Sequence, residues 1–215
     1  MIKFKNRQHA GQLLAQKLLT YQNNPNTLVL GLPRGGVVTA FEVAQALHLP
    51  LDIVVPRKIG APDNPELAIG AVTEDGTILF DKEIVALLKP SKYYLENTIE
   101  QEKKEAKRRL SVYRGNRPPL ELKNKVVILI DDGIATGATM RAAIASVKAR
   151  HAQKIIVAVP VAPQDTTHAI AQEVDEVIML SQPPDFIAIS AYYDYFEQTT
   201  DQEVIELMNN SKITS

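Results

Sequence analysis

The chain has 215 residues, a formal net charge of −1 at pH 7 and no cysteine. The lack of cysteine excludes disulfides, a thiolate nucleophile and Cys-ligated zinc, and the near-zero charge argues against broad attraction to nucleic acid. Residues 1–19 carry polar side chains throughout, and no stretch is apolar enough for a membrane span. We therefore expect one cytoplasmic domain over residues 1–215, with no nucleic-acid or membrane partner.

The first third of the chain predicts a helix, a strand, a glycine loop and a second helix. Alanine and leucine recur at helical spacing over residues 7–20, a short buried strand follows at 27–30, and an apolar helix is predicted over 37–47. The loop before that helix contains Arg34 and the glycine pair 35–36. Two glycines let the backbone approach a ligand closely, and arginine adds a fixed cation, although a purely structural turn is the alternative.

A proline-rich segment comes next. A strand is predicted at 51–55 and a loop of ten residues at 56–65, with three prolines and one glycine. Loops of this length beside a site often act as lids. Arg57 and Lys58 would bring positive charge to such a lid, and the alternative is a solvated turn with exposed cations.

Residues 66–72 and 77–80 predict a strand pair, and a helical insertion is expected over about 81–116. Within it, Asp81 and Ser91 are suitable caps for a short and a long helix. The long helix carries a basic cluster that fits either an anionic partner or, preferably, a solvated face with balanced charge; its members are Lys103, Lys104, Lys107, Arg108 and Arg109.

The most informative stretch is VVILIDDGIATGATMR. Residues 126–130 predict a strand buried on both faces, followed by Asp131 and Asp132, a small-residue loop at 133–139 and a helix over 140–149. A tight loop between a strand and a helix amino end gathers backbone N–H groups and hydroxyls, which predicts a phosphate site. The two acids would accept hydrogen bonds from sugar hydroxyls or suit a hard cation such as Mg²⁺.

Strands are predicted again at 154–161 and 174–180, with a helix over 163–172 between them. Alternating strands and helices predict an α/β fold, a doubly wound and mainly parallel sheet with ligands at the carboxyl ends of the strands.

The run from 126 to 139 resembles the phosphoribosyl diphosphate signature of type I phosphoribosyltransferases: four hydrophobic residues, two acids and a Thr-Gly-x-Thr loop. The resemblance implies that Asp131 and Asp132 bind the ribose hydroxyls and, indirectly through ribose and water, Mg²⁺. It also implies a 5′-phosphate site formed by Ala135, Thr136, Gly137, Ala138 and Thr139.

The same resemblance gives roles to the two earlier loops. In this family the loop after the first strand grips pyrophosphate, which implies substrate-binding roles for Arg34, Gly35 and Gly36. A flexible loop near 56–65 closes over the diphosphate, so the candidate catalytic cations are Arg34, Arg57 and Lys58.

Base recognition follows less directly from the resemblance. Purine-salvage members carry a Pro-Asp-x-Phe segment whose aromatic ring stacks on the base. Phe186 lies one residue early for that pattern, and a core or interface role is the alternative. Hypoxanthine-guanine enzymes have an Asp where this chain has Ala135, so any general base must come from elsewhere.

From FKNRQHAG to AYYDYFEQTTDQEV the chain is similar to predicted bacterial phosphoribosyltransferases whose acceptor is not established. The fold implied is the type I fold with a small C-terminal hood, and the reaction implied is Mg²⁺-dependent transfer from phosphoribosyl diphosphate to a nitrogenous base, releasing pyrophosphate. A non-catalytic sensor of the same donor or of a nucleotide is the alternative, and a homodimer stays open. A generic dinucleotide binder would show G-x-G-x-x-G after the first strand, which this chain lacks.

Overall fold

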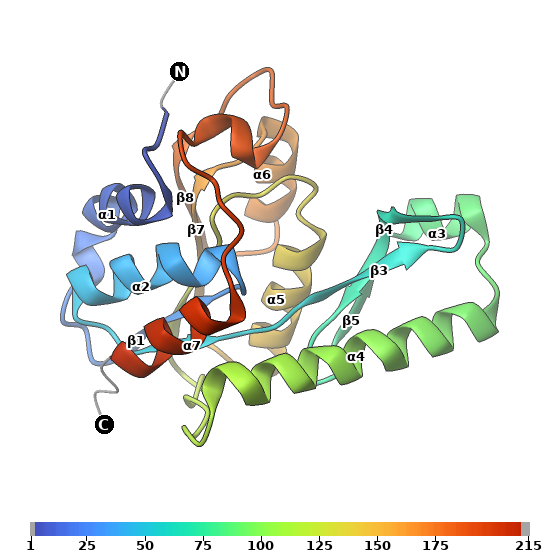
Figure 1. Cartoon of the computed structure of the whole chain (residues 1–215), viewed down its shortest axis with the longest axis horizontal. Helices are drawn as coiled ribbons and strands as arrows, with labels where there is room; N and C mark the ends of the chain where they lie inside the picture. The colour runs from blue at the N-terminus through green and yellow to red at the C-terminus, as the bar shows by residue number, and fades with distance from the viewer. Residues whose placement is uncertain (1–2, 212–215) are drawn as a thin grey trace.

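The computed structural model describes residues 3–211. Its body is a five-stranded sheet in the order β2-β1-β6-β7-β8, with every neighbouring pair parallel (Figure 1). The strands are β1 (Thr27–Gly31), β2 (Leu51–Ile53), β6 (Val126–Ile130), β7 (Lys154–Val161) and β8 (Glu176–Ser181). The predicted α/β fold with a parallel sheet is confirmed.

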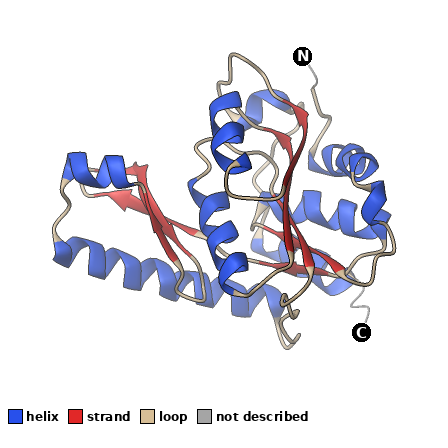
Figure 2. Ribbon diagram, turned by 180° about the vertical axis from the view of Figure 1, so that it is seen from behind, coloured by secondary structure: helices blue, strands red, loops and turns tan. Residues whose placement is uncertain are grey.

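Helices cover both faces of this sheet (Figure 2). One face packs against α1 (Arg7–Lys17), α2 (Gly35–Leu47) and α7 (Asp201–Asn210), and the other against α5 (Ala138–Ala149) and α6 (Gln164–Ala171). Successive side chains of β6 alternate between the two cores, because side chains of a strand point to opposite faces. Ile128 and Ile130 lie in the first core, whereas Val127 and Leu129 lie in the second.

A second unit projects from the body and is called the arm, residues 57–114 (Figure 1). It contains an antiparallel sheet of β3 (Arg57–Ala61), β4 (Asn64–Val72) and β5 (Ile78–Phe80), followed by α3 (Lys82–Leu88) and α4 (Lys92–Arg114). Its own small core is centred on Ile59, Ile69 and Val72, against which residues of α3 and α4 pack.

Side-chain caps fix the residues at which the two arm helices begin. The Asp81 side chain accepts from the N–H groups of Glu83 and Ile84, and the Ser91 hydroxyl accepts from that of Tyr94. At its far end α4 returns to the body, where Tyr113 is buried in the first core. The predicted helix starts and the strand pair before them are confirmed.

Several predicted elements differ from the structure, and one helix was missed. The loop predicted at 56–65 is wrong: β3 and β4 pair there as a hairpin, because Ile59 and Ile69 are buried together in the arm core. The helix predicted from residue 37 begins at Gly35. Helix α7 was not predicted, although a capping box between Thr200 and Glu203 starts it.

Residues 182–199 form a hood over the carboxyl end of the sheet. The amino-terminal segment lies beside it: Phe4 N–H donates to the Tyr192 carbonyl and Asp194 N–H to the Phe4 carbonyl, each over 2.8 Å. Two short 3-10 turns, Leu19–Tyr21 and Ile189–Tyr192, complete the elements of the described residues. Within residues 3–211, no helix is both long and apolar enough to cross a membrane.

Candidate functional site

The site lies where β1 and β6 end side by side. Gly31 pairs with Ile130 in parallel register, so the segments that follow the two strands leave the sheet at the same level. The chain continues from β1 to β2 on one side, whereas β6 leads to β7 and β8 on the other. This reversal is the topological switch point at which open α/β sheets bind ligands.

The glycine pair and the acid pair meet at this point. A Cβ atom placed on Gly35 would lie 2.0 Å from Oδ2 of Asp132, and one on Gly36 would lie 2.6 Å from Oδ1 of Asp131. A side chain at either position would displace a carboxylate, so glycine is required for this close approach. Both glycines lie in the first turn of α2 rather than in the preceding loop.

The loop after the acids is open at the amino end of α5. Gly137 caps that helix with a φ of 81°, a left-handed conformation that favours glycine. The Thr166 hydroxyl donates to the Ala135 carbonyl over 2.8 Å and holds the loop. Among the described residues, the N–H groups of 135–139 have no acceptor. Free N–H groups at a helix amino end form an anion site.

The two acids lie against each other in a largely buried place. Oδ1 of Asp131 accepts from the N–H of Asp132 over 2.8 Å, and Asp132 is 8% exposed. Burial, reinforced by the neighbouring charge of Asp132, raises the pKa of the Asp131 carboxyl well above its ordinary value. The acids therefore favour a ligand that supplies hydroxyl donors or positive charge.

Arg7 completes this cluster, and the sequence reasoning missed it. Its Nε donates to Oδ2 of Asp132 over 2.6 Å, and its Nη1 donates to the Glu197 carbonyl over 2.6 Å. The contact with Asp132 spans 125 positions, so no local spacing could predict it. The available signal was that the segment FKNRQHAG, which contains Arg7, resembles the start of the family's sequences. That resemblance does not indicate which residue Arg7 contacts.

Arg34 lies directly before α2 after a cis peptide bond from Pro33. Its Nη1 is 3.4 Å from Oδ1 of Asp201, and its side chain is 28% exposed, which leaves the guanidinium accessible. The same Asp201 oxygen accepts from the Tyr113 hydroxyl over 2.7 Å. Burial and then this hydrogen bond raise the pKa of Tyr113 to about 12.

Arg57 and Lys58 are not brought together, because adjacent residues of β3 point to opposite faces. Nε of Arg57 contacts Glu102 on α4 at 2.7 Å. Lys58 instead lines a cavity of about 340 Å³ together with Thr136 and Ala138. These two residues belong to the segment 133–139, which is called the phosphate loop after its predicted role. Of the two cations, only Lys58 faces the predicted phosphate site.

Comparison with known proteins agrees with this arrangement. The family model for the phosphoribosyl transferase domain matches residues 4–196. The chain belongs to the phosphoribosyl transferase family. Two curated proteins of Mycobacterium tuberculosis, MT0597 and Rv0571c, carry provisional phosphoribosyl transferase names and are 39% identical over 208 residues, 97% of this chain.

The chain spans 47% of the length of these two relatives. A solved structure, TT1426 from Thermus thermophilus, is 42% identical and superposes with a TM-score of 0.81 over 96% of this chain and 98% of that one. The similarity to TT1426 therefore extends over the body and the arm together.

The hood contains Phe186. Its ring stacks on Tyr192 with centroids 5.6 Å apart and planes 15° apart. Ile189 approaches the phosphate loop so closely that a Cβ on Gly133 would lie 2.7 Å from its Cγ2. The Tyr193 hydroxyl donates to the Asp132 carbonyl over 2.6 Å. The hood is thus attached to the acid pair.

Two features bear on whether the site could hold Mg²⁺. Among residues 3–211, no group of three or more His, Asp or Glu side chains could hold a metal ion alone. Mg²⁺ is commonly bound through one or two carboxylates together with substrate phosphates, and Asp131 with Asp132 fits that donor set.

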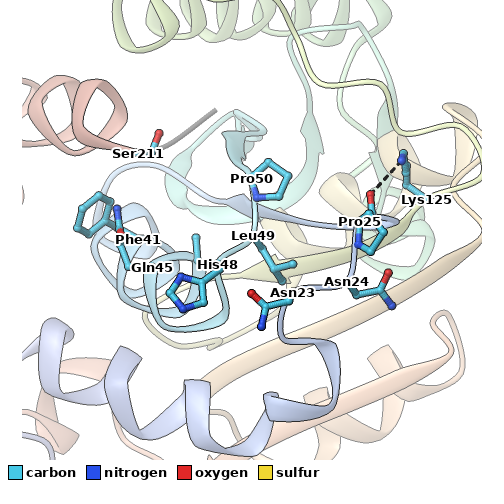
Figure 3. A pocket seen from close by; sticks show the side chains of 11 residues that line it. Asn23, Asn24, Pro25, Phe41, Gln45, His48, Leu49, Pro50, Lys125 and Ser211 are labelled. Atoms are coloured by element: carbon cyan, nitrogen blue, oxygen red, sulfur yellow. Dashed lines mark hydrogen bonds between the residues drawn. The ribbon is translucent and has the colours of Figure 1, made fainter. Parts of the chain in front are cut away.

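A separate cavity of about 650 Å³ lies at the opposite edge of the sheet (Figure 3). It is lined by residues that precede β1, β2 and β6, including Asn24, Pro50 and Lys125. Among residues 3–211, Lys125 is the one charged side chain that lines it and no carboxylate does. This part of its lining lacks the oxygen ligands expected of a magnesium–diphosphate site.

Proposed function

We propose that this phosphoribosyl transferase binds phosphoribosyl diphosphate with Mg²⁺ at the carboxyl edge of its parallel sheet and transfers the phosphoribosyl group to a nitrogenous base. The observation that carries the proposal is the contact of Gly35 and Gly36 with Asp132 and Asp131. This contact supports the proposal because the turn proposed for pyrophosphate and the acids proposed for the sugar lie side by side, as a diphosphate sugar requires.

Each part of the donor has a counterpart in the site. The free N–H groups of 135–139 suit the 5′-phosphate. Asp131 and Asp132 suit the ribose hydroxyls and, through ribose and water, Mg²⁺, which when bound would neutralise diphosphate charge. The partly exposed guanidinium of Arg34 suits the pyrophosphate, since its contact with Asp201 is long, at 3.4 Å.

Lys58 is proposed to add a cation on the arm side of the same volume. It lines the same cavity as Thr136 and Ala138. Its ion-pair partner Glu66 is open to solvent, with 92% of that side chain exposed. An exposed pair of this kind contributes little stability, so Lys58 can exchange partners readily. Arg57 is tied to Glu102 on the other face of β3 and serves the arm.

The chemical step proposed is displacement at the anomeric carbon: a ring nitrogen of the base forms the new bond as the bond to the pyrophosphate oxygen breaks. Pyrophosphate leaves with the bonding electron pair, and the proton of the ring nitrogen passes to water or to the released pyrophosphate. The protein's part is positioning and electrostatic stabilisation of the leaving group rather than a covalent intermediate. The base enters beneath the hood, where Phe186 is the proposed stacking residue. Because Ala135 cannot accept a proton, the phosphate loop supplies no general base.

The first test is isothermal titration calorimetry of the protein with phosphoribosyl diphosphate and Mg²⁺. Saturable binding by the wild type and a loss of about tenfold or more in Asp132→Asn are expected, because Asn cannot accept from hydroxyls as a charged carboxylate does. Absence of donor binding by a folded wild type contradicts the proposal. Pyrophosphate release with a panel of purines, pyrimidines and other ring-nitrogen bases then tests turnover. Binding without turnover for every base would favour the sensor.

A further inference from the structure

Arg7 and Asp132 form a nearly buried ion pair at the site, with each side chain 12% exposed. A buried pair of charges is an inefficient way to stabilise a fold, because dehydrating both groups offsets most of their attraction. This pair is also placed against the first turn of α2: a Cβ on Gly35 would lie 2.6 Å from Nε of Arg7. Its position points to a role in the site.

The guanidinium is fixed from several sides. Arg7 is the first residue of α1, whose start is capped by the Asn6 side chain accepting from the N–H of His9 over 2.9 Å. Cζ of Arg7 lies 3.8 Å from the ring centroid of Phe196, and Nη1 donates to the Glu197 carbonyl. Arg7 therefore links α1 and the hood to the acid pair.

These contacts hold Asp132 at its side chain and main chain alike. Oδ2 accepts from Arg7, the carbonyl accepts from Tyr193, and the N–H donates to Asp131. Among residues 3–211 the hydrogen bonds of Asp132 to Arg7, Tyr193 and the Asp131 side chain use its Oδ2, carbonyl and N–H, and no donor reaches Oδ1, so this oxygen, beside the Asp131 carboxyl, is left for a ligand. A carboxylate oriented in advance loses less conformational freedom when the ligand binds.

The positive charge of Arg7 is a second reason to assign it a role in the donor site. Two adjacent carboxylates would repel an anionic diphosphate sugar, and the opposite charge of the guanidinium beside Asp132 offsets one of them. Lysine in this position would keep the charge, but an ammonium is a compact donor without the planar fork that reaches Asp132 and Glu197 together.

We propose that Arg7 is a positioning residue of the donor site: it fixes the Asp132 carboxylate so that Oδ1 is free for a ribose hydroxyl, and it attaches that carboxylate to the hood. This inference rests on the proposed function, because it names a residue that prepares the donor site. Arg7 contacts Asp132 and the hood rather than the reacting atoms.

The test compares Arg7→Gln and Arg7→Lys with a matched control, Arg114→Gln. Arg114 makes two hydrogen bonds of 3.0 Å to Asp52 of β2, and the side chains of this pair are 12% and 5% exposed, a burial similar to that of Arg7 and Asp132. Each variant is measured by thermal unfolding and by calorimetric titration with phosphoribosyl diphosphate and Mg²⁺. Removing a group that orients a ligand-binding residue is expected to weaken donor binding by about 10- to 100-fold.

The expected result is that both Gln variants lose stability but only Arg7→Gln loses donor affinity, with Arg7→Lys intermediate and fully folded. In the Asp132→Asn background, Arg7→Gln should change donor affinity less than it does alone, because the two residues act together. Wild-type donor affinity in Arg7→Gln, an equal loss in Arg114→Gln, or additive effects in the double variant would overturn the inference while leaving the proposed function in place. No donor binding by the wild type would overturn both.

Discussion

A Cβ atom on Gly35 would lie 2.0 Å from Oδ2 of Asp132 and 2.6 Å from Nε of Arg7. The first turn of α2 therefore tolerates no side chain at this position without displacing the ion pair. Gly35 and Asp132, almost a hundred positions apart in sequence, therefore lie in direct contact.

Gly35→Ala should consequently disable the donor site. Displacing the carboxylate by about 1 Å is expected to weaken donor binding by roughly a hundredfold and to cost about 1–3 kcal/mol of stability. Calorimetry and thermal unfolding measure the two effects. Gly115→Ala is the control: its φ is 59°, so alanine is strained there, but a Cβ would meet nothing within 4 Å. It should lower stability alone; equal donor affinity in the two variants would contradict the geometry.

Lys58→Met and Arg57→Met should have different effects although the residues are adjacent. Lys58 faces the phosphate loop across a cavity, whereas Arg57 is paired with Glu102 on α4. Lys58→Met is expected to weaken donor binding by about tenfold, the equivalent of roughly 1.4 kcal/mol. Arg57→Met should leave donor affinity unchanged and lower the stability of the arm by about 1 kcal/mol or less, as for a partly exposed ion pair. Similar donor affinities in the two variants would show that Lys58 has no part in binding.

Tyr193→Phe tests the attachment of the hood. The variant removes the hydroxyl that donates to the Asp132 carbonyl and leaves that carbonyl without its partner. Loss of a buried partner is expected to cost about 1–3 kcal/mol, measured by chemical denaturation. Tyr195→Phe is the control, because Tyr195 is 72% exposed; its effect should be within about 0.5 kcal/mol. Equal stabilities of the two variants would argue against the bond.

Glu74 should make stability depend on pH. Burial raises the pKa of its carboxyl above the ordinary value of 4.5, although Oε2 accepts from the Val55 N–H over 2.8 Å. Because the folded state holds this proton more tightly than the unfolded state, the contribution of Glu74 is most favourable below pH 4.5 and declines as pH rises through the raised pKa. Glu74→Gln should therefore be more stable relative to the wild type at pH 7 than at pH 4, as measured by urea denaturation at both values. A difference in stability that does not change with pH would show that folding does not raise the pKa of the Glu74 carboxyl.

Most of the body could be predicted from sequence because its strands are continuous apolar runs that alternate with segments able to form helices. The acid pair and the phosphate loop follow one such strand directly, so their place at the carboxyl edge followed from the pattern alone. Ile128 and Val127, buried on opposite faces of the sheet, show why the run at 126–130 has no polar alternation.

The features that sequence reasoning missed depend on distant contacts. Three prolines and a glycine at 56–65 indicated a loop, yet the burial of Ile59 against Ile69 in the arm core stabilises a hairpin. Likewise, Arg7 is one of several cations near the amino terminus, and its partner Asp132 is brought to it only by the packing of α1 and the hood. Neither contact leaves a local signal.

The parallel pairing of β1 with β6 also has a consequence for synthesis on the ribosome. Gly31 and Ile130 are paired, but the whole arm is translated between them. Until β6 emerges, β1 has β2 on one edge and a bare hydrogen-bonding edge on the other, which is an aggregation liability for a nascent chain. The arm, with its own core, can form during this interval, and closing the long connection completes the sheet and the site in one late step.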